Sequence, residues 1–279
     1  MGAARSRCEA ESGTESGDVN CPMFNVGDYL RRIGVGGPVE PTWETLRLLH
    51  KRHLMSVAYD NSGAADRLPA SGRLASVDLN TVFKHVVVDG NGGVCYELNR
   101  LFHKLLDALG YEVFIVAASI RQANGSYSPG EDHWFNLVRF AGQLCLVDVS
   151  FAGPSFLEPL RLSDEQQHQY GCSYRMTVQD GYRVVERKPR EGEWQPVYRF
   201  KPEHIDASGW ESVQLDGLDD YAENSVLAGT TLRSRASENG QMVLTGKRYL
   251  TVEDGFERIR VLVKPTEYQQ VVDFILAGA

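Results

Sequence analysis

The sequence lacks the features by which metal and redox proteins are most easily recognised. Its 279 residues include five cysteines, an odd number at long spacings, and no two of them form a Cys-x-x-Cys pair. This pattern argues against a zinc site and against a thioredoxin-like redox site. A reducing cytoplasm, where each thiol is free for its own chemistry, fits the cysteines best. We therefore expect no bound metal and no resident cofactor.

Excess positive charge and long apolar runs are also missing. Lys and Arg total 29 against 37 Asp and Glu, a net charge of −8, so a basic face for nucleic acid is not expected. No run of 18 apolar residues is present, and a membrane span is therefore not expected either. Residues 1–22 are polar and lack the apolar centre of a secretory signal, which predicts a disordered tail.

The sequence after the predicted tail divides into a helical first part and a strand-rich second part. Apolar spacing and turn residues predict two helices within 25–53, a loop over 59–73, and helices over 77–88 and 95–109. Strands are predicted over 112–120, 134–140, 143–151, 174–178, 182–187, 195–200 and 241–251, with a helical or irregular 206–224 and a closing helix over 266–276. Helices followed by strands favour an α+β chain in three lobes over a doubly wound sheet.

Cys95 is a candidate nucleophile because of its place in this pattern. It follows the pair Gly92-Gly93 and opens a strongly amphipathic helix. The positive end of a helix stabilises a thiolate, and the glycines let the chain turn tightly and let a substrate approach. The alternative is a small buried core residue, which free cysteines often are.

His133 and Asp148 are candidate partners for this thiol. His133 begins an apolar strand after a polar loop, although a surface histidine at a strand end would look the same. Asp148 interrupts an apolar run and needs a partner if it is buried. The two flank a hairpin turn predicted at Ala141-Gly142, so they can lie on adjacent strands. Cys, His and Asp in this order match the geometry of papain-like thiol enzymes.

His50 and His53 are weaker candidates for a functional site. Their spacing on a helix is compatible with a metal site, but no third ligand is evident nearby. We interpret both as residues of the helix face.

Two segments resemble the arylamine N-acetyltransferase family. Residues 91–99, Asn-Gly-Gly-Val-Cys-Tyr-Glu-Leu-Asn, resemble its signature Arg-Gly-Gly-x-Cys-x-Glu-x-Asn, and the spacings to His133 and Asp148 look like those of its triad. Residues 41–53 resemble its N-terminal Pro-Thr-x-x-Thr-Leu-x-x-Leu-His segment. The resemblance starts near Phe24 and fades after about Tyr198.

The resemblance implies a helical bundle, a β-barrel and an α/β lid. The expected boundaries are a disordered tail over 1–22, a bundle with the catalytic cysteine over 23–110, a barrel with the histidine and aspartate over 111–205, and a lid over 206–279. It implies a ping-pong reaction in which Cys95 takes an acyl group from a thioester and passes it to an aromatic amine. The donor would be coenzyme A or a carrier-protein phosphopantetheine. Candidate substrate-binding residues are Tyr59, Val94, Phe135 and Phe151, although aromatic residues in strands are more often core.

Three departures from the family lie around the pocket. Asn91 replaces the arginine of the signature, which leaves the partner of Glu97 open. Residues 57–61, Val-Ala-Tyr-Asp-Asn, replace Pro-Phe-Glu-Asn, and 134–136, Trp-Phe-Asn, are bulkier than usual. These changes favour the ansamycin amide synthases, which resemble this family and keep its triad. They release a polyketide chain from a carrier protein as a macrolactam, by closing it on its own aryl amine.

Other functions fit the same residues. An acetyl-CoA-dependent arylamine N-acetyltransferase would use the same triad, with a separate arylamine as acceptor. A thiol hydrolase would use water and release a free acid. A non-catalytic binding protein could retain the fold, but the complete triad argues against it. The sequence does not fix the oligomeric state.

Overall fold

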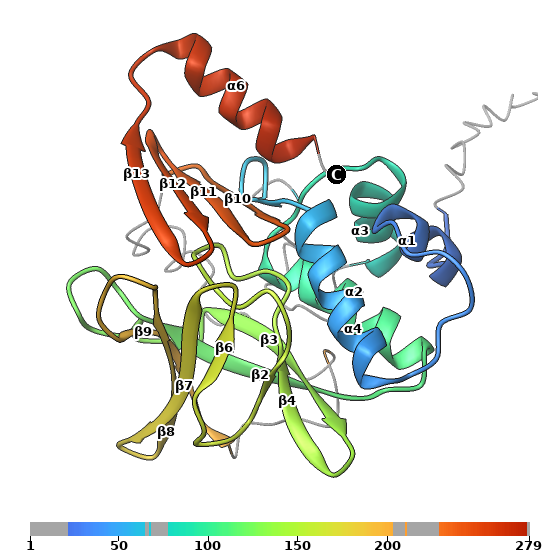
Figure 1. The fold of residues 1–279 in the computed structure, drawn as a ribbon. Helices are drawn as coiled ribbons and strands as arrows, with labels where there is room; N and C mark the ends of the chain where they lie inside the picture. The colour runs from blue at the N-terminus through green and yellow to red at the C-terminus, as the bar shows by residue number, and fades with distance from the viewer. Residues whose placement is uncertain (1–21, 65–66, 68–77, 203–209, 211–228, 278–279) are drawn as a thin grey trace, which may run out of the picture.

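The computed structural model describes residues 22–64, 67, 78–202, 210 and 229–277 (Figure 1). The predicted tail and most of the 206–224 segment therefore lie outside the described residues. No described helix is long and apolar enough to cross a membrane.

Helices form the first part of the chain, as expected. They are α1 (Val26–Arg32), α2 (Trp43–Ser56), α3 (Leu79–Phe83), the π-helix η3 (Lys84–Val88) and α4 (Cys95–Ala108). The Thr42 hydroxyl accepts the backbone N–H of Thr45 at 3.1 Å and caps α2. Gly110, with φ +88°, ends α4 in the left-handed conformation that suits glycine. The apolar stripe of α4 is buried at Leu98, Leu101, Phe102, Leu105 and Leu106.

An eight-stranded antiparallel sheet curves into a nearly closed barrel beside the helices (Figure 1). Its strand order is β5-β4-β3-β2-β9-β8-β7-β6. The strands are β2 (Glu112–Ile120), β3 (His133–Phe140), β4 (Gln143–Val147), β5 (Leu160–Arg161), β6 (Gln167–Gln169), β7 (Cys172–Gln179), β8 (Tyr182–Lys188) and β9 (Gln195–Phe200). Its core includes Val116, Phe135, Leu137, Leu146, Tyr198 and Phe200.

The β3–β4 connection confirms the predicted hairpin. Ala141 and Gly142 have φ of +48° and +79°, the conformation of a tight two-residue turn. The strand predicted over 143–151 is wrong at its end, because β4 stops at Val147. The backbone N–H of Asp148 donates to His50 Nε2 at 3.2 Å, so this group does not continue the strand ladder.

A second, five-stranded sheet has the order β1-β10-β11-β12-β13. Its strands are β1 (Tyr59–Asp60), β10 (Leu232–Ser237), β11 (Gly240–Thr245), β12 (Arg248–Glu253) and β13 (Phe256–Val261), and α6 (Pro265–Leu276) packs on one face. Strand β1 corrects the loop predicted over 59–73, because Tyr59 and Asp60 pair with Ser234 and Arg233. Tyr59 also forms a parallel bridge with Gly93, which links this sheet to the start of α4. The α+β fold class is confirmed.

Candidate active site

Cys95 is the first residue of α4 and is buried, with 7% of its surface exposed. The two preceding glycines are required by close packing. A Cβ atom on Gly92 would lie 2.6 Å from the Ala58 carbonyl oxygen, and one on Gly93 would lie 2.9 Å from Leu98 Cδ2. The contact with backbone leaves no room for a larger residue at position 92, whereas a larger residue at position 93 would require the side chain of Leu98 to move. The segment before Cys95 therefore lies directly against β1 and α4.

Glu97 fixes the first turn of α4. Its Oε2 accepts the backbone N–H of Val94 at 3.0 Å, which satisfies a group that the helix itself leaves unpaired. The Glu97 carboxylate is 1% exposed and is paired with Arg67, whose Nε and Nη2 lie 2.7 and 3.0 Å from its two oxygens. Arg67 thus supplies the cation for which the sequence left the partner open, and Asn91 instead contacts His85.

His133 and Asp148 meet at the mouth of the β3–β4 hairpin. His133 begins β3 and its Nε2 lies 2.7 Å from Asp148 Oδ2. Both side chains are buried, and the Cys95 side chain is close enough to His133 to raise the pKa of the imidazole. Because Nε2 contacts the carboxylate, Nδ1 is the nitrogen that remains for the thiol. The structure therefore brings together all three residues that the sequence selected.

Three further residues hold Asp148. Its Oδ1 accepts Asn99 Nδ2 and the backbone N–H of Ser150, each at 3.1 Å. His50 Nδ1 donates to the Leu157 carbonyl oxygen at 2.9 Å, which leaves Nε2 to accept the backbone N–H of Asp148. These contacts fix both the carboxylate and the backbone that carries it.

The charge states of His133 and Asp148 depend on each other. Burial would lower the pKa of His133, but the Asp148 charge and hydrogen bonds to Asp148 and Cys95 raise it to about 10. Burial would raise the pKa of Asp148, but His133 and the hydrogen bonds from Asn99 and Ser150 lower it. Asp148 can therefore stabilise a protonated imidazole, as the third member of a triad does.

His50 and His53 are both fully buried helix residues, as interpreted from the sequence. Burial lowers the pKa of each, to about 3 for His53, and His53 Nδ1 contacts the Tyr29 hydroxyl at 3.0 Å. Within the described residues no group of three or more His, Cys, Asp and Glu side chains is arranged to hold a metal ion. His50 serves instead as a neutral support for Asp148.

The four proposed substrate-binding residues lie on two sides of the triad. Phe135 stacks on His133 at 6.0 Å between ring centres but is completely buried in the barrel, whereas the partly buried Phe151 approaches the same ring edge-on at 5.5 Å. Val94 directly precedes Cys95, and Tyr59 lies in β1 beside Gly93. Of the four, the partly buried Phe151 and Tyr59 are the best placed to meet a ligand.

The sequence analysis missed several residues of this site. Tyr198 lies 5.3 Å from the His133 ring, and burial together with the Asp148 charge raises its pKa, so its hydroxyl stays protonated. His50 was interpreted only as a helix residue, because its contact with the backbone of Asp148, 98 residues away, is not visible in the sequence. Arg67 lies in a segment with no regular pattern, and its sequence gives no sign of its role.

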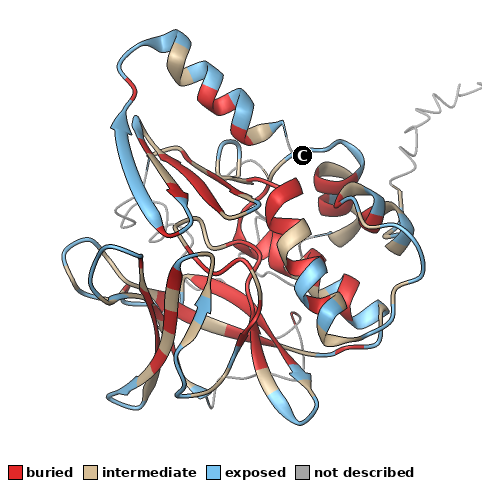
Figure 2. Ribbon diagram, viewed as in Figure 1, coloured by how far each residue is buried: buried red, intermediate tan, exposed pale blue. Residues whose placement is uncertain are grey.

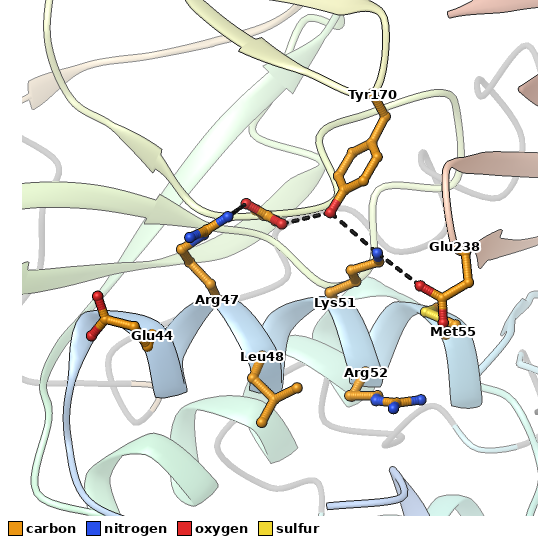
Figure 3. Close-up of a pocket in the computed structure, with 9 residues that line it drawn as sticks. Glu44, Arg47, Leu48, Lys51, Arg52, Met55, Tyr170 and Glu238 are labelled. Carbon is orange, nitrogen blue, oxygen red and sulfur yellow. Dashed lines mark hydrogen bonds and ion pairs between the residues drawn. The ribbon is translucent and has the colours of Figure 1, made fainter. Parts of the chain in front are cut away.

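A groove of about 270 Å³ is lined by side chains of α2 together with Glu158, Tyr170 and Glu238 (Figure 3). Two ion pairs cross it, Arg47–Glu158 at 2.6 Å and Lys51–Glu238 at 2.9 Å. The Tyr170 hydroxyl joins them through Glu158 and Lys51. Two of its three cations, Arg47 and Lys51, are thus already paired, and none of the triad residues lines it.

Comparison with known proteins decides the family. Residues 42–276 match the family model described as N-acetyltransferase. The chain belongs to the arylamine N-acetyltransferase family. It is 37% identical over 258 residues to proansamycin X synthase of Amycolatopsis mediterranei, across 92% of this chain and 98% of that protein. It is 30% identical over 188 residues to an arylamine N-acetyltransferase of Mycolicibacterium smegmatis, across 64% of this chain and 66% of that one.

These relatives are acyl-transfer enzymes, and they confirm that this member of the family is an N-acyltransferase. The match to proansamycin X synthase supports the amide synthase branch. Solved structures agree on the fold. The arylamine N-acetyltransferase of Mycobacterium abscessus superposes with a TM-score of 0.75 at 23% identity, over 91% of this chain and 90% of that one. The Mycobacterium marinum enzyme in complex with CoA gives 0.73 at 22%, over 91% and 93%.

Proposed function

We propose that this enzyme forms an amide through an acyl-Cys95 intermediate and that its reaction is the release of a polyketide chain as a macrolactam. The observation that carries the acyl-cysteine step is the buried contact of 2.7 Å between His133 Nε2 and Asp148 Oδ2, with the Cys95 side chain near the same imidazole. The 37% match to proansamycin X synthase supports the macrolactam product.

The first half-reaction transfers the acyl group to the enzyme. The Cys95 thiolate attacks the carbonyl carbon of the thioester, and the carbon–sulfur bond of the donor breaks. His133, protonated and stabilised by Asp148, gives its proton to the leaving thiolate. The products are an acyl-Cys95 enzyme and a free carrier or coenzyme thiol, and His133 is left neutral.

The second half-reaction forms the amide. The aryl amine nitrogen attacks the acyl-Cys95 carbonyl while neutral His133 accepts a proton from the amine. The bond from the carbonyl carbon to Cys95 Sγ then breaks and restores the thiolate and the protonated imidazole. When the amine belongs to the same chain, the product is a ring. Phe151 and Tyr59 are proposed to contact the acyl or aryl part of the substrate, since both are only partly buried beside the triad.

Intact-protein mass spectrometry tests this proposal on the wild type and on Cys95→Ala. Each protein is incubated with acetyl-CoA and, separately, with a long acyl thioester that ends in an aryl amine. Turnover of the long thioester to a cyclic amide, without an acetyl adduct, supports macrolactam formation. An acetyl adduct that passes to added arylamine supports the second candidate, an acetyl-CoA-dependent arylamine N-acetyltransferase, which the Mycolicibacterium smegmatis relative favours.

Two other results would contradict the proposal. Release of free acid without an amine product would indicate a thiol hydrolase. An unreactive Cys95 with neither donor would remove the acyl-cysteine step altogether. A cytoplasmic location remains a prediction from the cysteine pattern.

A further inference from the structure

The far edge of the C-terminal sheet carries a cluster of cations on an otherwise acidic chain. The protein has a net charge of −8. Five exposed cations nevertheless lie on β12, β13 and the residues next to them: Lys247, Arg248, Arg258, Arg260 and Lys264. Arg248 pairs with Val261, and Arg260 pairs with Tyr249, so Arg248 lies on one face of this edge and Arg258 and Arg260 lie on the other. Within the described residues only Arg260 has an acidic partner, Glu267 at 3.0 Å. We call these five residues the basic edge.

Exposed apolar side chains alternate with these cations. Ile259, Val261 and Val263 are 51%, 66% and 76% exposed. Strand β13 is the last strand of its sheet, and Figure 2 shows it exposed along its whole length. An edge strand with apolar side chains and an unused row of backbone groups is a typical place for another molecule to bind.

The sheet register places part of the basic edge at the Cys95 end of the sheet. Tyr59 and Gly93 pair in parallel, so the chain runs in one direction from Tyr59 to Asn61 and from Gly93 to Cys95. Asn61 Oδ1 accepts the backbone N–H of Leu232 at 2.8 Å. Cys95 therefore lies toward the end of the sheet where β10 begins, at Leu232.

The same end continues across the remaining strands to the part of the basic edge formed by Lys247, Arg248 and Lys264, whereas Arg258 lies three residues further along β13 from Val261. Leu232 pairs with Thr245, Thr245 with Arg248, and Arg248 with Val261. The Leu262 N–H donates to the Lys247 carbonyl oxygen at 2.8 Å, which brings the residues before Lys264 to this corner. Five strand spacings separate the Gly93 segment from β13, or about 24 Å.

We propose that the basic edge is the docking surface for an acidic carrier protein that holds the acyl group on its phosphopantetheine arm. This inference rests on the proposed function, because it concerns the donor of that reaction. An acidic partner is otherwise repelled by a chain of charge −8, so a local group of unpaired cations is needed to attract and orient it. The separation of about 24 Å between the Gly93 segment and β13 suits a donor that carries its acyl group at the end of a flexible arm.

A second copy of the chain fits this edge less well. Antiparallel pairing of β13 with itself, centred on Ile259, would place Arg258 opposite Arg260 of the other copy. Like charges placed opposite each other across two strands destabilise the pair. The charge of the edge therefore favours an acidic protein over self-association.

The test compares two donors with the same aryl-amine acyl chain, one on an acidic polyketide carrier protein and one on pantetheine. In Lys247→Glu/Arg248→Glu, we expect kcat/KM for the carrier-bound donor to fall about tenfold or more, mainly through KM, with a weaker salt dependence than in the wild type. Turnover of the pantetheine donor should stay within about twofold of the wild type. Lys104→Glu/Arg139→Glu is the matched control, because these cations are 47% and 44% exposed on α4 and β3.

Three results would overturn the docking surface. An equal loss with both donors would show that the defect is in the active site. No loss with the carrier-bound donor would show that the basic edge does not recognise the carrier protein. A dimer in light scattering that dissociates in the edge variant would likewise overturn the inference, in favour of a second copy.

Failure of the proposed function gives a different result. In that case the wild type turns over neither donor. Titration of the enzyme with the unloaded carrier protein then decides the docking claim alone. Binding that is weakened by the edge variant and not by the control supports it, and absence of binding overturns it.

Discussion

The two ends of the triad are held in place by different kinds of contact. At the Cys95 end, six consecutive residues from Gly92 to Glu97 provide the close turn, the helix start and the carboxylate that caps it. At the Asp148 end, the supports come from His50 and Asn99, which are 98 and 49 residues away in sequence. The first arrangement is a local motif, and the second exists only after the barrel has packed against α2 and α4.

Arg67 is the exception at the Cys95 end. It approaches Glu97 from 30 residues away and completes a buried ion pair that the local motif does not supply. We therefore expect changes at the Asp148 contacts to lower activity most, and changes at the exposed ion pairs of the α2 groove to lower it least.

Asp148→Asn should have the largest effect. An amide at this position can offer an N–H to His133 Nε2 and favour the wrong tautomer, which in a comparable triad lowers turnover by about 10⁴-fold. The measurement is kcat/KM for the amide product, with the melting temperature as a check of folding. Asp132→Asn, next to His133 but hydrogen-bonded to Ser128, is the control and should stay close to the wild type. Activity of Asp148→Asn within tenfold of the wild type would refute a triad role.

Arg67→Ala should cost about 3 kcal/mol of unfolding free energy, because it leaves the Glu97 carboxylate buried without its cation. Adding Asn91→Arg to this variant returns an arginine to the position that it holds in the family signature. We expect the double variant to regain at least about half of the lost stability. Urea denaturation and the rate of Cys95 alkylation measure the two effects. A double variant no more stable than Arg67→Ala would show that position 91 cannot reach Glu97 here.

His53 should make the protein less stable in acid. Burial, His50 and Arg32 lower its pKa from 6.5 to about 3, so the folded protein holds it neutral. The unfolded chain binds the proton more readily, and this stability is fully present above pH 6.5 and lost as the pH falls toward 3. In His53→Asn, the urea midpoint should fall less between pH 7.5 and pH 5. An unchanged pH dependence would assign the acid sensitivity to other groups.

Arg47→Ala should have the smallest effect. Arg47 is 46% exposed and its pair with Glu158 crosses the groove in Figure 3. Exposed pairs contribute at most about 1 kcal/mol, so stability should change by less than that and activity should not change. Thermal unfolding beside Arg67→Ala measures the contrast. A loss as large as that of Arg67→Ala would mean that the groove supports the site as strongly as the buried pair does.

Much of the fold could be predicted from local patterns, and the errors have physical causes. The α4 helix and the Ala141-Gly142 hairpin followed from apolar spacing and turn residues. Strand β1 was missed because two residues give no periodicity, and its partner β10 lies far away in sequence. The end of β4 was misplaced because the pattern could not show that the Asp148 N–H bonds to a histidine.

The sequence alone identified the family and selected the candidate nucleophile and the order of the proposed triad, because each depends on short motifs with fixed spacing. Only the tertiary structure decided which groups support that chemistry. Contacts between distant segments supply the cation for Glu97 and fix the neutral tautomer of His50. They also place the basic edge in the same sheet as the segment that leads to Cys95. Burial makes those contacts necessary, since a charge or an N–H removed from water must find its partner wherever the fold provides one.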